Sequence, residues 1–124
     1  MIVIKKITQA VFKKHFRAVE EFVKSPIRTQ ERNFDYLLNH GRNTLIGSEF
    51  HFDEIKGITD FQKRVPIFRY DDLRPYLEKI IHNGSNNVLW DTPTRWFAMS
   101  SGTTNDKSKY IPVTKESLEN CHYR

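Results

Sequence analysis

Apolar residues near the amino terminus recur at intervals of three and four, with lysines on the intervening positions. The apolar positions are Ile4, Ile7, Val11, Phe12, Phe16, Val19, Phe22 and Val23. This spacing forms a single stripe along a helix of 3.6 residues per turn. The pattern therefore predicts an amphipathic helix over residues 4–23, whose apolar stripe needs a partner.

A second helix is predicted directly after Ser25-Pro26. Serine is a favoured N-cap residue, and proline fits the first helical position, where its missing N–H costs no hydrogen bond. The apolar positions that follow are Ile27, Phe34, Leu37 and Leu38, and Gly41 ends the pattern. We expect the two helices to pack as a hairpin, because contact between their stripes removes apolar surface from water at about 25 cal/mol per Å².

The middle of the chain mixes loops and short helices. Residues 47–57 alternate apolar and polar positions irregularly, which indicates a loop with one helical turn after Asp53. Thr59-Asp60 is placed to cap a short helix that carries Phe61. Pro66 ends this helix, because the residue before a proline disfavours the helical region.

A further helix is predicted to begin at Asp71 or Asp72, either of which can serve as its cap. Pro75 is tolerated in a first turn, where backbone N–H groups lack partners within the helix. Asn83-Gly84 stops the helix. The side chains expected to face inward are Leu73, Leu77, Ile80 and Ile81.

The pattern changes after residue 84. Residues 96–99 and 110–113 are short aromatic or β-branched runs, Trp-Phe-Ala-Met and Tyr-Ile-Pro-Val, which are typical of strands. They flank a polar loop, and Thr114 is placed to cap a last helix. Trp90 and Trp96 are expected in the core.

The loop from Ser100 to Lys109 combines the side chains that bind phosphate. Gly102 allows a tight turn and a close approach of the backbone, successive N–H groups can form an anion nest, and serine and threonine hydroxyls add donors. Lys109 and Lys107 supply positive charge. The loop does not fit the Walker pattern, because no second glycine precedes a lysine at the required spacing.

A simpler interpretation of the same loop is an ordinary turn, since short runs of serine, threonine and glycine between strands usually are turns. Lys107 is then a solvated surface lysine. Arg64 and Arg69 could reach a phosphate, but a surface pairing with Asp60 or Asp71 explains them more simply. Asp71 and Asp72 are likewise explained by helix capping.

Two segments of the sequence favour phosphate binding over an ordinary turn. Phe97-Ala98-Met99-Ser100-Ser101-Gly102-Thr103-Thr104, continued by Lys109-Tyr110-Ile111-Pro112, resembles the phosphate-binding motif of adenylate-forming enzymes. Upstream lie Phe61-Gln62-Lys63-Arg64-Val65-Pro66-Ile67 and Tyr70-Asp71-Asp72-Leu73-Arg74-Pro75-Tyr76. The upstream segment followed by the loop segment is similar to the same pair of segments in the auxin-responsive Gretchen Hagen family of acyl-acid amido synthetases. The resemblance covers the chain from about Gln30 onward.

The resemblance implies a two-step reaction that uses ATP and Mg²⁺. A carboxylic acid attacks the α-phosphate of ATP to give an acyl adenylate, and the amine of an amino acid then displaces AMP. It also implies that Ser100, Ser101, Gly102, Thr103 and Thr104 bind the ATP phosphates. Lys109 matches the motif lysine and is the implied catalytic residue, because its charge can stabilise the departing pyrophosphate.

The expected fold class is α/β, and within these residues α+β. Residues 1–84 are mainly helical, and residues 85–124 form a strand, a phosphate loop, a strand and the start of a helix. The resemblance implies that residues 1–124 are a partial amino-terminal adenylating domain, truncated at the carboxyl end. We expect this piece to be inactive alone and only marginally folded, because two strands lack their sheet neighbours.

Charge is the basis of an alternative function. The net charge is +5, and residues 1–24 hold six Lys or Arg against two Glu, whereas the other hundred hold fourteen against thirteen Asp or Glu. A non-enzymatic basic helical module could bind an anionic surface or a protein partner, although such a face is more often simply solvated. The chain lacks the compact basic and aromatic patch of nucleic-acid modules, so no nucleic acid is expected as a partner.

The remaining side chains exclude several classes of site. Cys121 is the only cysteine, so no internal disulfide or cysteine-rich metal site can form, and a reducing cytoplasm is the expected location. No apolar run approaches the length of a membrane span, and no membrane partner is expected. The histidines have no metal-ligand spacing, so no metal-binding residues are predicted. They are His15, His40, His51, His82 and His122.

Overall fold

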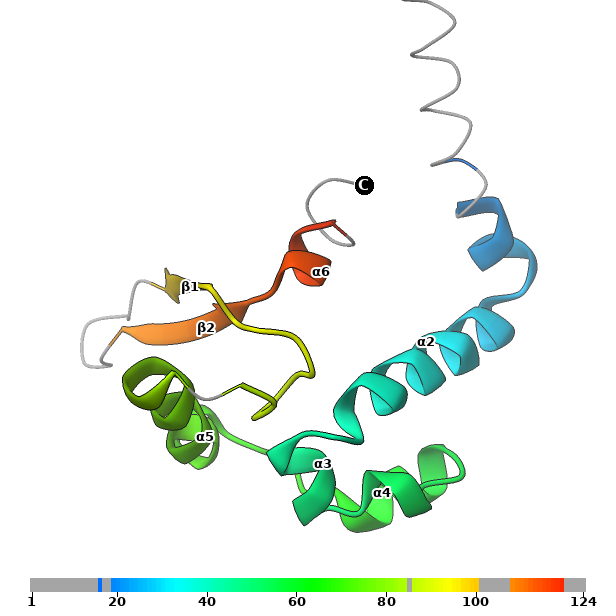
Figure 1. The fold of residues 1–124 in the computed structure, drawn as a ribbon. Helices are drawn as coiled ribbons and strands as arrows, with labels where there is room; N and C mark the ends of the chain where they lie inside the picture. The colour runs from blue at the N-terminus through cyan, green and yellow to red at the C-terminus, as the bar shows by residue number, and fades with distance from the viewer. Residues whose placement is uncertain (1–15, 17–18, 85, 101–107, 120–124) are drawn as a thin grey trace, which may run out of the picture. The chain divides into compact units, whose positions relative to one another are not determined.

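The computed structural model describes residue 16 and residues 19–84, 86–100 and 108–119 (Figure 1). The chain divides into two compact units, and the boundary falls after Tyr36, within a helix. The second unit contains the short helices and the two-stranded sheet. Helices and an antiparallel strand pair in one chain confirm the expected mixture of α and β structure.

The first long helix, α2, spans Pro26–Gly41 and follows helical residues 19–24 after a one-residue break at Ser25. Its predicted limits are confirmed at both ends. Leu38 is buried at 5% exposure, whereas Ile27 is 72% exposed.

The predicted hairpin of the first two helices is not found among the described residues, and that expectation was wrong for them. Phe22 and Val23 are 56% and 70% exposed. The Ser25 N–H donates to the Glu21 carbonyl at 2.9 Å, and the Ser25 carbonyl accepts from the Thr29 N–H at 3.0 Å. These helix-like bonds continue through the break, and a single residue leaves no loop in which the chain could reverse.

The segment after α2 is more helical than the sequence pattern predicts. α3 spans Leu45–Glu49, and the 3₁₀ helix η1 spans Phe52–Glu54. Thr44 caps α3: its Oγ1 accepts from the Gly47 N–H at 3.0 Å and donates to the Gly41 carbonyl at 2.6 Å. At 1% exposure Thr44 is fully buried, so its hydroxyl needs these two bonds.

α4 spans Ile58–Arg64 with Gly57 as its N-cap, so it begins two residues earlier than a cap at Thr59 would place it. Asp60 lies in its first turn, where its carboxylate accepts from the Lys56 N–H at 3.2 Å. The helix ends before Pro66, as predicted.

α5 spans Tyr70–Asn83. Arg69 is its N-cap, and Asp72 caps the start from the third helical position, where its Oδ2 accepts from the Arg69 N–H at 2.7 Å. Pro75 therefore lies in the second turn and not in the first, so it removes one hydrogen bond that the helix would otherwise make. The helix ends at Gly84, whose φ of 61° is the left-handed conformation that glycine adopts readily.

The sheet is one antiparallel pair, β1 (Trp96–Ser100) and β2 (Lys109–Val113), drawn as two adjacent arrows in Figure 1. The register pairs Phe97 with Pro112 and Met99 with Tyr110 on one face. Phe97 packs against the core. Both strands were predicted to within one residue at each end.

The hydrophobic core of the second unit is centred on α5. Tyr76, Ile80 and Val88 form a buried cluster. Partly buried side chains around it are Ile46, Phe68, Leu73, Leu89 and Phe97. The prediction that Trp96 and Ile81 face inward was wrong: they are 50% and 39% exposed, while Trp90 is half-buried.

No helix in the described ranges has the length and apolar character needed to cross a membrane.

Candidate functional site

The predicted phosphate loop joins the two strands of the sheet. β1 ends at Ser100, β2 begins at Lys109, and these two residues are direct partners in the antiparallel register. The predicted ligands Ser101, Gly102, Thr103 and Thr104, together with Lys107, lie outside the described residues. Only the two ends of the predicted site can therefore be placed, and they lie opposite each other at one end of the strand pair.

Lys109 lies at the contact between β2 and the start of α5. Its Nζ is 5.7 Å from the centroid of the Tyr70 ring, within the range of a cation–π interaction. The Tyr70 hydroxyl accepts a hydrogen bond of 2.8 Å from the Tyr110 N–H. Lys109 and Tyr70 are both half-buried. The motif lysine is thus held against an aromatic ring at the start of a helix.

This contact brings together the two segments that carry the family resemblance. Tyr70 opens the Tyr-Asp-Asp-Leu-Arg-Pro-Tyr segment, and Lys109 lies at the end of the loop, thirty-nine positions later. The two segments follow each other along the chain, but no pattern in the sequence predicts that they are in contact.

The charged residues of the upstream segment have local partners. Arg64 pairs with Glu54 at 2.6 Å, not with Asp60 or Asp71, so the predicted partner was wrong. Asp71 lies 3.4 Å from the guanidinium of Arg74, one helical turn away. These pairs are exposed and contribute little to stability.

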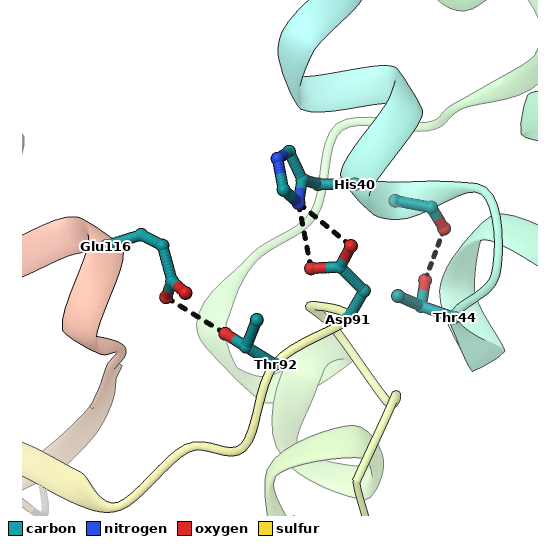
Figure 2. Close-up of polar contacts among 6 residues, drawn as sticks. His40, Thr44, Asp91, Thr92 and Glu116 are labelled. Carbon is teal, nitrogen blue, oxygen red and sulfur yellow. Dashed lines mark hydrogen bonds and ion pairs between the residues drawn. The ribbon is translucent and has the colours of Figure 1, made fainter.

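A second polar cluster lies where α2, the segment before β1, and α6 (Lys115–Ser117) meet (Figure 2). Figure 2 shows the His40 ring pointing at the Asp91 carboxylate, with Nδ1 at 2.8 and 2.9 Å from its two oxygens. The His40 ring also stacks on Trp90 at 4.7 Å. Thr92 donates to Glu116 at 2.9 Å. His40 and Asp91 are fifty-one residues apart, so no motif spacing could have indicated their pairing.

Hydrogen bonds at the start of α6 lower the pKa of Glu116. Its own backbone N–H is the largest cause, the Thr92 and Thr114 hydroxyls and the charge of His40 act in the same direction, and desolvation opposes them. Thr114 caps α6, as predicted: its Oγ1 accepts from the Ser117 N–H at 3.2 Å.

Glu116→Gln is expected to destabilise the protein at neutral pH. The loss of stability should diminish as the pH falls below 4.5, the ordinary pKa of a glutamate carboxyl group. Because the folded state releases this proton at lower pH than the unfolded state, the ionised carboxylate stabilises the fold above 4.5, and that contribution is lost as the pH falls through the folded pKa. Urea denaturation of both proteins at about pH 7 and about pH 3 measures the difference. Glu119→Gln, at an exposed position, is the matched control. A defect of equal size at both pH values would contradict the assignment.

Among the residues that the structure describes, no three His, Cys, Asp or Glu side chains come together in a way that could hold a metal ion.

A family model described as the GH3 family N-terminal domain matches residues 15–124. The match covers both segments discussed above and all the described helices and strands of the fold.

Several curated plant proteins are similar to this chain. Indole-3-acetic acid-amido synthetase GH3.2 of Arabidopsis thaliana is 28% identical over 106 residues, which are 86% of this chain and 19% of the relative. Probable indole-3-acetic acid-amido synthetase GH3.2 of Oryza sativa subsp. japonica is 32% identical over 107 residues, 84% of this chain and 15% of the relative. The 4-substituted benzoates-glutamate ligase GH3.12 of Arabidopsis thaliana is 35% identical over 63 residues, 51% of this chain and 11% of the relative. The chain thus spans about a fifth or less of the length of these relatives.

Proposed function

The chain belongs to the GH3 family, and from this premise we propose that it forms the amino-terminal part of an ATP-dependent acyl-acid amido synthetase. The intact enzyme would activate a carboxylic acid with ATP and join it to an amino acid. The names of the relatives support this reaction class, since they are amido synthetases of indole-3-acetic acid and a benzoate–glutamate ligase.

The observation that carries the proposal is the direct pairing of Ser100 with Lys109 at the ends of the serine- and threonine-rich loop. A hydroxyl and an ammonium group on facing strand ends are the donor and the charge that a phosphate group requires. The chemistry of the two ends therefore fits the triphosphate of ATP.

In the proposed site, Ser100, Ser101, Gly102, Thr103 and Thr104 would hold the phosphates through hydroxyl and N–H groups. Mg²⁺ bound with the nucleotide would supply further positive charge. Lys109 would stabilise the charge that develops as pyrophosphate leaves, which is most effective from a lysine already held in position.

Lys109→Ala in the full-length protein is expected to lower ATP–pyrophosphate exchange about a hundredfold, the usual cost of removing one preorganised charge-stabilising group. Ser101→Ala is expected to weaken the same activity by a smaller factor. Acid-dependent exchange of labelled pyrophosphate into ATP measures both. Lys79→Ala, which removes an exposed lysine of α5, is the matched control and should retain full activity.

Undiminished ATP–pyrophosphate exchange in Lys109→Ala and Ser101→Ala would contradict the roles assigned to these two residues. We expect residues 1–124 alone to show no exchange, because the proposed site then lacks its remaining walls. The alternative of a basic helical module would be favoured if the protein ignored ATP and bound anionic lipid or nucleic acid in a steeply salt-dependent way.

A further inference from the structure

Tyr70 contacts β2 in two ways at once. Its ring faces the ammonium group of Lys109 at 5.7 Å, and its hydroxyl accepts the Tyr110 N–H at 2.8 Å. Lys109 and Tyr110 are the first two residues of β2, and Tyr70 is the first residue of α5. One side chain therefore links the start of a helix to both the backbone and the charged group at the start of the second strand.

We propose that Tyr70 is a positioning residue, which holds the Lys109 ammonium at the end of the strand pair for its task in adenylation. This inference rests on the proposed function, because it assigns Tyr70 a role only through Lys109. No catalytic role is assigned to Tyr70 itself.

The physical argument begins with the flexibility of lysine. A lysine side chain has four rotatable bonds and a strongly hydrated point charge, so on an exposed strand end it samples many positions. An aromatic face within 6 Å attracts the ammonium through the ring quadrupole and narrows that range. The half-buried setting of Lys109 strengthens the attraction, because less water competes for the charge.

The hydroxyl of Tyr70 restricts the movement of its own ring relative to β2. In the antiparallel register Tyr110 pairs with Met99 of β1, while its N–H donates to Tyr70. The hydroxyl end of the ring is thereby bonded to the backbone of the residue next to Lys109. The other end of the side chain is fixed by the Tyr70 backbone, which belongs to the first turn of α5. A movement of the ring relative to the strand would break this bond.

A purely structural role for Tyr70 predicts different behaviour. Tyr70 does not belong to the buried cluster of Tyr76, Ile80 and Val88. If it served only to attach α5 to β2, its loss would lower stability and would affect activity whether or not Lys109 were present. If it acts through Lys109, the effect on activity disappears once Lys109 is removed.

The test is a double-mutant cycle in the full-length protein, with ATP–pyrophosphate exchange as the readout. Tyr70→Leu is expected to lower the exchange rate roughly three- to tenfold, the range that a cation–π contact of this kind represents. The double variant Tyr70→Leu, Lys109→Ala is expected to be within about twofold of Lys109→Ala alone. Tyr36→Leu, which removes a partly exposed tyrosine of α2, is the matched control.

Variants that keep an aromatic face should rescue the activity. Tyr70→Phe and Tyr70→Trp are expected to be clearly less impaired than Tyr70→Leu, because the ring that attracts the ammonium is retained and only its hydrogen bond to the Tyr110 N–H is lost. Tyr70→Met replaces the leucine variant if that variant does not fold. Thermal melting of each variant reports separately on stability.

The outcomes separate the two proposals. Exchange that survives in Lys109→Ala overturns the role assigned to Lys109 and, with it, the role of Tyr70. A strong loss in Lys109→Ala combined with a neutral Tyr70→Leu, or with effects that multiply in the double variant, overturns the positioning role and leaves the proposed function standing. A phenylalanine variant as impaired as the leucine variant also overturns it.

Discussion

Gly47→Ala is expected to destabilise the protein by about 3 kcal/mol or more, because the added methyl group would overlap the backbone of a neighbouring segment. A Cβ at this position would lie 1.9 Å from the carbonyl oxygen of Gly41 and 2.8 Å from its carbonyl carbon. Both atoms belong to the backbone and cannot rotate away. The same carbonyl accepts the hydrogen bond of the buried Thr44 hydroxyl at 2.6 Å, so displacing it would also leave the hydroxyl that caps α3 without its acceptor.

Two other glycines supply matched controls. At Gly57 a Cβ would meet nothing within 4 Å and the backbone is extended, so Gly57→Ala is expected to change stability by no more than about 0.5 kcal/mol. At Gly41 a Cβ would lie 2.8 Å from the Phe52 ring, which can shift, and we expect an intermediate loss. Denaturation by urea, followed by circular dichroism, measures all three. Equal midpoints for Gly47→Ala and Gly57→Ala would show that α2 and α3 do not approach this closely.

Tyr76→Ala is expected to cost about 3–5 kcal/mol, because it removes the central ring of the core. The side chain is 9% exposed, belongs to the cluster with Ile80 and Val88, and meets the Phe68 ring edge-on at a centroid distance of 6.5 Å. α5 has no other aromatic residue in this cluster. The cavity would open beneath the helix whose first residue contacts Lys109.

Tyr76→Phe separates the ring from the hydroxyl. It removes only the bond from the hydroxyl to Glu49, at 2.6 Å, and is expected to cost about 1 kcal/mol. Burial, together with the hydrogen bond and the charge of Glu49, raises the pKa of Tyr76 from 10.0 to about 12. The folded state then keeps this proton while the unfolded state loses it, so stability falls as the pH rises from 10 to about 12.

Urea denaturation across that pH range checks both statements. The phenylalanine variant should lose less stability than the parent between pH 10 and 12, since it lacks the titrating group. A Tyr76→Ala variant no less stable than Tyr76→Phe would contradict the central place of the ring. Identical pH dependence of Tyr76→Phe and the parent would contradict the raised pKa.

Helix boundaries set by proline and glycine could be predicted well from the sequence. α2 begins at Pro26, α4 ends before Pro66, and α5 ends where Gly84 adopts a left-handed conformation. In each case the cause is the backbone of the residue itself, which acts whatever surrounds it. The strands were found for a similar reason, since short aromatic and β-branched runs favour extended structure locally.

α3 was missed because its stability is not local. The helix has five residues and contains a glycine, which disfavours helix in isolation. It is held by the Thr44 cap and by the contact of Gly47 with Gly41, and its first N–H groups donate to the carbonyls of Asn87 and Val88. None of these partners can be inferred from the five residues alone.

By itself, the sequence determined the position of most helices and strands, the α+β character and the resemblance that the family match confirms. These depend on local backbone preferences and on the order of residues in two segments. Only the tertiary structure decided that Tyr70 meets Lys109 and that His40 meets Asp91. Such contacts join residues thirty-nine and fifty-one positions apart, and they depend on how separate elements pack, which no local pattern encodes.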